Sequence, residues 1–476
     1  MKVAIVLHAH LPYVRAEAPW TVEERWFHDA LWTCYLPLLE VFEEGPLTVS
    51  LSPPLIEMLR DRTLHSRFEA HLDALDELNE THREVTGEVG AFYSRRIAGA
   101  RTRWLHHRGD VLGRLGRAWD RGDIELWTTG VTHGFFPGLA VIDGTVEAQV
   151  RLGKKVFADA LGRAPDGFWL PECGIDARVA RRVAGDVKLS LVDAHAVQAG
   201  GTTADGLVLW PRNLEASHRV WSRDHGYPRS PLYREFHRDL GHDREAGPFG
   251  RGTMTGLKLH GIDGAPYRAR EAEVQAKRDA ADFVQWLDAE ARSGRQALVT
   301  AYDAELFGHW WFEGPVFLRE VLAGLSGHPR LSPVMVSQLE PEGLVQPEAS
   351  SWGRGGDHRV WIGPCTAHLW RHVHGTARQM QRAVGSIDPG DEESPAARGV
   401  AHALRHGLQL QASDWAFALE DGSAADYAQG RIRRHRRGVR EGLEAARTGD
   451  VSSLPDPSRA GFLMGLRDED LRAPFR

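Results

Sequence analysis

Short apolar runs that end in polar residues recur along the first 300 residues of the chain. Runs of this kind are typical of strands buried in a parallel sheet. The strand-length runs are residues 2–7, 47–51, 123–129, 167–170, 189–192 and 296–302, and weaker candidates are residues 220–222 and 253–259. Apolar positions at helical spacing occupy residues 26–42, 146–161, 271–292 and 316–325. The alternation of strand and helix predicts an α/β barrel with its site at the carboxyl ends of the strands.

Longer stretches depart from this alternation. Residues 55–121 are charged and helical, which predicts a helical insertion within the barrel, and residues 205–264 are rich in Gly and Pro, which predicts mostly loops. The last part of the chain carries the helical runs 366–384, 396–419 and 424–446, followed by an extended tail from Ser452. We therefore predict a catalytic barrel over residues 1–345 and a helical domain over residues 346–476 that completes the active-site groove.

The most informative polar cluster follows the strand at 296–302. There the chain reads Asp303, Glu305 and His309, with Trp310 and Trp311 beside them. Strand, acidic loop and helix in this order are typical of a catalytic loop at the carboxyl end of a barrel strand. An aromatic-rich loop can also serve packing alone, but packing requires neither two carboxylates nor a histidine.

A second carboxylate, Glu172, comes directly after the strand at 167–170 and Pro171. One interpretation is a structural glutamate held in an ion pair. The other is a catalytic acid that works with Asp303. Cleavage of a glycosidic bond uses two acids, one that attacks or activates water and one that protonates the leaving oxygen. We therefore predict Glu172 and Asp303 as the catalytic pair, with their carboxyl groups about 5–6 Å apart, as in retaining enzymes.

Histidines also follow the predicted strands. His8 and His10 follow the first strand, His133 the third and His195 the fifth. In metal-dependent amidohydrolase barrels such histidines bind a metal, and Asp303 could complete that set. Alternatively, the histidines donate hydrogen bonds to sugar hydroxyls. The second carboxylate and the surplus of tryptophan favour the sugar interpretation.

The chain contains 16 tryptophans. Indole rings pack well in cores, and they also stack on the apolar faces of sugar rings. Trp352 and Trp361 bracket a Gly-rich turn and are candidates for a sugar platform, although anchoring of the C-terminal domain is an alternative for one of them. Trp221 and Trp310 also lie beside polar residues, as does Asp414 in the C-terminal domain.

The bulk properties narrow the choice of function. A net charge of −7 does not favour a nucleic-acid interface. The three cysteines have neither disulfide nor zinc spacing. The apolar run at residues 2–7 is too short for a signal peptide, and no apolar stretch approaches the roughly 20 residues of a membrane span. We expect a cytoplasmic, monomeric protein that binds neither nucleic acid nor membrane.

These motifs resemble glycoside hydrolase family 57, and within it the α-1,4-glucan branching enzymes. The resemblance is carried by residues 8–14 (HAHLPYV), 130–137 (GVTHGFFP), 169–172 (WLPE), 302–310 (YDAELFGHW), 221–228, 352–361 and 412–415. It implies a (β/α)7 barrel with a helical insertion and a helical C-terminal domain, no metal or other cofactor, and α-1,4-glucan as substrate. It also implies that Glu172 is the nucleophile and Asp303 the general acid/base. The predicted substrate-binding residues are His8, His10, His133, Trp221, Trp310, Trp352, Trp361 and Asp414.

The sequence departs from the branching-enzyme pattern at two places. Gly174 and Ile175 stand where an aromatic residue usually follows the nucleophile. The interval 196–220 is short and lacks tyrosine, whereas the resemblance implies a long Tyr-tipped loop that shields the glycosyl-enzyme from water. We therefore predict a branching enzyme with substantial hydrolysis. The alternatives are a mainly hydrolytic α-amylase of the same family, a metal-dependent amidohydrolase and a non-catalytic glucan-binding protein.

Overall fold

The computed structural model describes residues 1–222, 224–388, 391, 393–455 and 461–475. The chain divides into two compact units. Unit 1 contains Met1–Val49, Met58–Glu125 and Asn213–Leu339, and unit 2 contains Ser50–Glu57, Leu126–Arg212 and Glu340–Arg476. Each unit therefore combines segments that are distant in the sequence. The functional division at residue 345 stays a prediction.

Unit 1 contains parallel strands arranged around β1 (Lys2–Ala9). β1 pairs with β8 (Ala297–Asp303) and, at its start, with β9 (Ser332–Val334), and β2 (Leu47–Leu51) is its other neighbour. Every residue from Val3 to Ala9 is buried, which explains the unbroken apolar run in the sequence. The parallel register sets His8 opposite Asp303, so both residues lie at the carboxyl ends of their strands.

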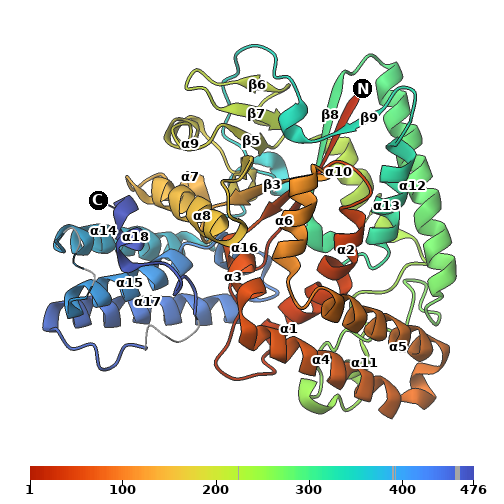
Figure 1. Cartoon of the computed structure of the whole chain (residues 1–476), viewed down its shortest axis with the longest axis horizontal. Helices are drawn as coiled ribbons and strands as arrows, with labels where there is room; N and C mark the ends of the chain where they lie inside the picture. The colour runs from red at the N-terminus through yellow and green to blue at the C-terminus, as the bar shows by residue number, and fades with distance from the viewer. Residues whose placement is uncertain (223, 389–390, 392, 456–460, 476) are drawn as a thin grey trace. The chain divides into compact units, whose positions relative to one another are not determined.

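The helices of unit 1 include the predicted insertion. They are α1 (Val22–Ala30), α2 (Leu36–Val41), α4 (Arg62–Thr81), α5 (Arg83–His106), α6 (Val111–Arg121), α10 (Leu214–Trp221), α11 (Leu240–Asp243), α12 (Ala269–Arg292) and α13 (Gly314–Leu325). α3 (Pro53–Arg60) is divided between the units. Asp61 caps α4 by accepting from the backbone N–H groups of Thr63 and Leu64. α4 packs against α5, and α12 packs against α13 (Figure 1).

Unit 2 contains the remaining strands, apart from residues 124–125 at the start of the first of them, which belong to unit 1. β3 (Ile124–Thr129), β4 (Gly167–Trp169), β5 (Leu189–Val192) and β7 (Val208–Pro211) pair in parallel in that order, and β6 (Gly201–Thr202) pairs antiparallel to β7. Helices α7 (Phe136–Leu139), α8 (Thr145–Leu161) and α9 (Ala177–Val183) connect these strands. The strand–helix alternation predicted from the sequence is thus present.

The C-terminal part of unit 2 is helical, as predicted. It contains α14 (Ala367–Gly385), α15 (Pro395–Leu410), α16 (Ser413–Asp421), α17 (Ala425–Thr448) and α18 (Asp468–Arg472). α15 packs against both α14 and α17 (Figure 1). Aromatic residues from the segment after β3, from β4 and from the C-terminal part of unit 2 share one buried core, which includes Phe135, Phe136, Phe168, Trp361, Trp370 and Trp415.

Several local predictions were wrong. Residues 220–222 end helix α10 rather than forming a strand, and residues 253–259 form an irregular segment between α11 and α12. The tail is not simply extended, because α18 buries Leu471 and Arg472; residues 456–460 lie outside the described part. The α/β class, the helical insertion and the helical C-terminal part are confirmed.

Candidate active site

Glu172 lies in a tight turn directly after β4. Glu172 and the following Cys173 both adopt positive φ angles, 61° and 50°, and so does His133 with 53°. Such angles cost non-glycine residues on the order of 1–3 kcal/mol each, so the surrounding contacts must hold them in place. Gly174 follows because any larger side chain would clash: an added Cβ atom would lie 2.5 Å from the ring of Phe135.

The Glu172 carboxylate accepts hydrogen bonds at both oxygens. The indole Nε1–H of Trp352 donates to Oε2 over 2.7 Å, and the hydroxyl of Ser413 donates to Oε1 over 2.8 Å. The Nδ1 atom of His133 lies 3.5 Å from the same Oε1 atom. We name these residues, Glu172, His133, Trp352 and Ser413, the Glu172 cluster. Both donors favour the ionised carboxylate, the form that a nucleophile requires.

The tautomer of His133 follows from the bond between its Nδ1 atom and the oxygen of Ser413, which are 3.0 Å apart. Since Ser413 gives its one proton to Glu172, its oxygen must accept from His133 Nδ1–H. The backbone N–H of Ser413 also donates to the carbonyl of His133 over 3.1 Å. The start of helix α16 is thus fastened to the loop after β3.

Trp352 is itself held by charged residues of unit 2. The guanidinium of Arg212 donates to the Trp352 carbonyl over 3.3 Å and lies 5.6 Å from the indole ring. Arg212 also pairs with the buried Asp193 over 2.6 Å, and Asp193 accepts from His195. Asp193 and His195 follow β5. They hold Arg212 in place, and through Arg212 they support the orientation of Trp352. None of the described hydrogen bonds joins either residue to Glu172.

Replacing Ser413 by alanine is expected to lower kcat roughly tenfold while leaving KM unchanged, because one hydrogen bond to a charged group is lost. The matched control is Ser423→Ala. Ser423 also donates to a carboxylate, that of Asp421, but at an exposed position. Steady-state kinetics on a soluble glucan measure the effect. Equal rates for the two variants would contradict a role of Ser413 in holding Glu172.

Asp303 ends β8 in unit 1, close to His8 near the end of β1 and to His10, which follows β1. His8 is its register partner, and the rings of His8 and His10 stack with centroids 5.8 Å apart. Burial, followed by the neighbouring His10, holds the pKa of His8 well below its usual range, so this ring is neutral near pH 7. We name His8, His10, Asp303, Glu305 and Tyr35 the Asp303 cluster.

Glu305 links the loop after β8 to the loop after β1. Its Oε1 atom accepts from the backbone N–H of His10 over 3.1 Å and from the hydroxyl of Tyr35. Tyr35 lies in a π-helical segment, Leu31–Tyr35, and π-helical turns are frequent at functional sites. Gly308 permits this contact, since a Cβ atom there would lie 2.1 Å from the carbonyl oxygen of Thr33.

Burial raises the pKa of Glu305 to about 7, against the lowering effect of the Tyr35 and His10 hydrogen bonds. The ordinary pKa of this group is 4.5. Between pH 4.5 and about pH 7, the folded protein therefore keeps a proton on Glu305 that the unfolded chain releases. The stabilising contribution is therefore complete below pH 4.5 and is lost as the pH rises through about 7. This difference corresponds to about 3 kcal/mol of unfolding free energy.

We expect Glu305→Gln to remove this pH dependence, because glutamine keeps the accepting Oε1 atom but does not titrate. Urea unfolding at pH 5 and pH 8 measures the difference. Glu320→Gln is the control, since Glu320 pairs with Lys277 at the surface. If the wild type and Glu305→Gln lose the same stability between these pH values, the buried carboxyl is not responsible.

The predicted tryptophans differ in their exposure. Trp221 is 58% exposed and Trp310 is 42% exposed, so both present ring surface to solvent. Trp361 is only 1% exposed and stacks on Phe135 with centroids 4.9 Å apart, so its ring presents no surface to a sugar, and we assign it a packing role. Asp414 is half-buried in the first turn of α16, next to Ser413.

Sequence reasoning did not identify Ser413 or Tyr35. Ser413 lies within the motif at 412–415, so the motif pointed to the right segment but to its neighbour Asp414. Tyr35 lies in the middle of the helix predicted over residues 26–42, and no residue pattern in that stretch predicts the π-helical turn. Within the described residues, no group of three or more His, Cys, Asp or Glu side chains is arranged to hold a metal ion. No helix in that part of the chain is long and apolar enough to cross a membrane.

Comparison with protein-family models gives two matches. Residues 4–225 match the model described as glycosyl hydrolase family 57. Residues 372–455 match the model described as 1,4-alpha-glucan branching enzyme, C-terminal. The first match contains His133 and Glu172, and the second contains Ser413. Three members of the Glu172 cluster thus fall in matched segments, and Trp352 lies between the two segments.

Individual relatives match over nearly the whole chain. A probable 1,4-alpha-glucan branching enzyme of Mycobacterium tuberculosis is 29% identical, with 98% of this chain and 96% of the relative covered. The structure of an alpha-amylase from Thermotoga maritima is 30% identical with a TM-score of 0.85, covering 99% of this chain and 96% of that one. That of a branching enzyme from Pyrococcus horikoshii is 27% identical with a TM-score of 0.82, covering 91% and 88%. These similarities confirm the predicted (β/α)7-type fold class.

Proposed function

Because the chain belongs to glycosyl hydrolase family 57, we propose that it is a 1,4-α-glucan branching enzyme with a retaining mechanism. The observation that carries the proposal is the hydrogen bond from Ser413 to Glu172. It joins a residue of the segment matching branching enzymes to the carboxylate that the family resemblance assigns as nucleophile. The substrate, an α-1,4-glucan, follows from the names of the relatives.

In the first step, a Glu172 oxygen attacks the anomeric carbon of a glucosyl unit. The bond to the glycosidic oxygen breaks, and Asp303 gives that oxygen its proton. In the second step, Asp303 takes the proton of an incoming 6-hydroxyl, whose oxygen attacks the anomeric carbon and releases Glu172. The product is an α-1,6 branch. The separation of the two carboxyl groups expected for a retaining enzyme stays a prediction.

The other side chains bind and orient the glucan. His133 and Ser413 hold the nucleophile in its attacking orientation, and Trp352 does the same from the other oxygen. His8 and His10 stand at the strand end beside Asp303, where they can donate to sugar hydroxyls. The exposed rings of Trp221 and Trp310 offer stacking surface for glucosyl units, and Asp414 offers an acceptor for a hydroxyl.

Water competes with the 6-hydroxyl for the glycosyl-enzyme. Transfer wins only where the site excludes water and holds an acceptor in reach. The interval 196–220 contains β6, β7 and most of α10, so secondary structure occupies much of it and little remains for a shielding loop. We therefore expect a larger share of hydrolysis than in relatives with a long Tyr-tipped loop.

Incubation with amylose tests this proposal, with α-1,6 linkages counted by NMR and hydrolysis counted as new reducing ends. We expect both products, with branches formed. A chimera that carries a long Tyr-bearing loop in place of residues 200–205 is expected to release fewer reducing ends per branch. Branching with negligible reducing-end release, unchanged in the chimera, would contradict the shielding argument.

The second candidate function is an α-amylase of the same family. It is favoured by the 30% identity to the alpha-amylase from Thermotoga maritima. The amylose experiment separates the two functions, because an amylase releases reducing ends without forming α-1,6 linkages.

A further inference from the structure

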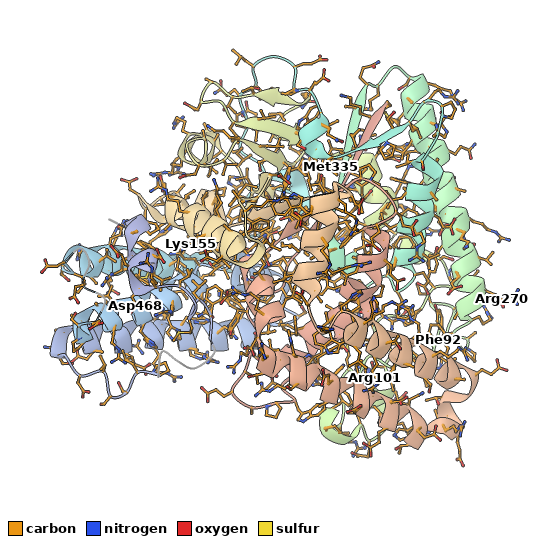
Figure 2. The ribbon with its side chains drawn as sticks, in the orientation of Figure 1. Phe92, Arg101, Lys155, Arg270, Met335 and Asp468 are labelled. Atoms are coloured by element: carbon orange, nitrogen blue, oxygen red, sulfur yellow. The ribbon has the colours of Figure 1, made fainter. Side chains whose placement is uncertain are left out.

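A hollow of about 400 Å³ opens between α5 and the first turn of α12 in unit 1, and no part of the proposed reaction uses it. Its lining residues are Phe92, Arg95, Arg96, Gly99, Arg103, Ala269, Arg270 and Glu273. Figure 2 shows Phe92 on α5 and Arg270 at the start of α12, with Arg101 further along α5. Small-molecule sites commonly have volumes of roughly 300–1,000 Å³, so the hollow suits a small ligand.

The lining is strongly basic. It contains four arginines and one glutamate, which together carry a formal charge of +3. Of these arginines, Arg103 pairs with Glu40. Among the described residues, Arg95, Arg96 and Arg270 have no carboxylate within ion-pair distance. Unpaired guanidinium groups that converge on one hollow leave donors available for an anion.

Arg96 is the most informative of the three because it is half-buried. Its guanidinium lies 5.0 Å from the centre of the Phe312 ring, and Arg234 lies 4.0 Å from the same centre. Burial and then the repulsion of Arg103 lower the pKa of Arg96. A cation desolvated beside other cations is unfavourable unless something compensates it. Phe312 belongs to the loop between Asp303 and α13, so the hollow adjoins the segment that carries the proposed acid/base.

The N-terminus of α12 adds to the positive potential. α12 is 24 residues long and no side chain caps its first turn, where Glu271 pairs with Arg268. The unsatisfied N–H groups and the helix dipole favour an anion near this end. Ala269 and Arg270, which open the helix, both line the hollow.

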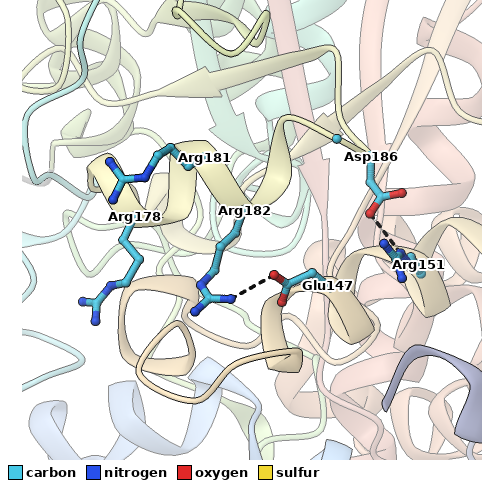
Figure 3. Close-up of a pocket in the computed structure, with 7 residues that line it drawn as sticks. Glu147, Arg151, Arg178, Arg181, Arg182 and Asp186 are labelled. Atoms are coloured by element: carbon cyan, nitrogen blue, oxygen red, sulfur yellow. Dashed lines mark hydrogen bonds and ion pairs between the residues drawn. The ribbon is translucent and has the colours of Figure 1, made fainter. Parts of the chain in front are cut away.

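A second arginine-lined hollow shows the contrast. It has a volume of about 700 Å³ and lies between α8 and α9 in unit 2 (Figure 3). There Arg182 pairs with Glu147 over 3.0 Å and also with Asp143, and Arg151 pairs with Asp186 over 3.0 Å. Arg178 pairs with Asp176 as well, so carboxylates already occupy three of the four guanidinium groups in this hollow, and it is a weaker candidate for an anion site.

We propose that the hollow between α5 and α12 binds a phosphorylated sugar, with the phosphate held by Arg95, Arg96 and Arg270. The planar guanidinium fork matches the geometry of phosphate oxygens. The hollow is larger than a phosphate group alone fills, and the half-buried ring of Phe92 offers an apolar surface to the sugar ring. This site is distinct from the Glu172 cluster and the Asp303 cluster, and it does not depend on the proposed reaction.

Titration calorimetry of the full chain with glucose 1-phosphate at low salt tests the proposal. We expect saturable binding of one ligand per chain. Affinity should fall about tenfold or more in Arg96→Met, which keeps the stacking on Phe312 but removes the charge. The double variant Arg95→Gln/Arg270→Gln changes only exposed positions, so it tests the site without disturbing the fold. Arg101→Gln is the matched control, since Arg101 lies on the same helix and pairs with Asp73.

The result that supports the site is weaker binding in both hollow variants and unchanged binding in Arg101→Gln. Absence of binding to the wild type, or equal affinity in all variants, would overturn it. Inorganic phosphate and maltose serve as separate titrants. Inorganic phosphate that binds as tightly as glucose 1-phosphate would overturn the assignment of a sugar. Maltose binding that weakens in both hollow variants as much as glucose 1-phosphate binding does would overturn that of a phosphate.

Discussion

Replacing Glu172 by glutamine is expected to lower turnover of α-1,4-glucan by about 10⁴-fold or more, since an amide cannot form the covalent intermediate. Glucan binding should persist, because glutamine has nearly the same shape. The Glu172 cluster accommodates it: Trp352 can still donate to the side-chain oxygen, and the Ser413 hydroxyl can turn to accept from the new amide group. Single-turnover kinetics and affinity electrophoresis on glucan measure the two quantities.

Ser413→Ala is the graded comparison for Glu172→Gln, since it keeps the nucleophile and loses only one of its hydrogen bonds. If Glu172→Gln retains substantial activity, the carboxylate is not the nucleophile. If it loses glucan binding together with activity, its role is structural, and the interpretation as a structural glutamate held in an ion pair gains support.

Replacing Asp303 by asparagine is expected to cause a loss of similar size on glucan, because neither the leaving oxygen nor the incoming hydroxyl can then exchange a proton. The two variants should differ on maltosyl fluoride. Fluoride leaves without strong protonation, so Asp303→Asn should still release it in the first step, whereas Glu172→Gln should not.

Azide extends this comparison to the second step. Azide needs no base to attack, so it should restore turnover of maltosyl fluoride by Asp303→Asn and form a maltosyl azide. Failure of both fluoride release and azide rescue would contradict the assignment of Asp303 as acid/base. Rescue of Glu172→Gln in place of Asp303→Asn would exchange the two roles.

The strands were predicted well from the sequence, because a strand that is buried on both faces consists mostly of consecutive apolar residues. β2 and β5 begin and end at the predicted residues. Residues 253–259, which alternate apolar and polar positions only in part, were a weaker candidate and do not form a strand. Their backbone donors and acceptors instead find partners such as Asp239, whose carboxylate accepts from Thr255 and Gly256, and a pattern of apolar residues does not reveal such a partner.

The candidate site was predicted unevenly for a related reason. Glu172 and Asp303 were predicted from their positions at the carboxyl ends of strands, from the two acids that glycosidic cleavage uses and from the family resemblance, and their catalytic roles stay predictions. Contacts between distant segments left no local signal. Ser413 reaches Glu172 across 241 positions of sequence, and Tyr35 reaches Glu305 across 270. Trp361 resembled a sugar platform in its Gly-rich context, yet it fills a core position against Phe135.

The most direct test of the central proposal is to trap the glycosyl-enzyme. Asp303→Asn is incubated with maltosyl fluoride, digested with a protease, and analysed by mass spectrometry. The proposed mechanism predicts one maltosyl group attached to the peptide that contains Glu172, because the first step proceeds while the second lacks its base. A maltosyl group on a different residue, or fluoride release with no covalent intermediate and an inverted product, would contradict it.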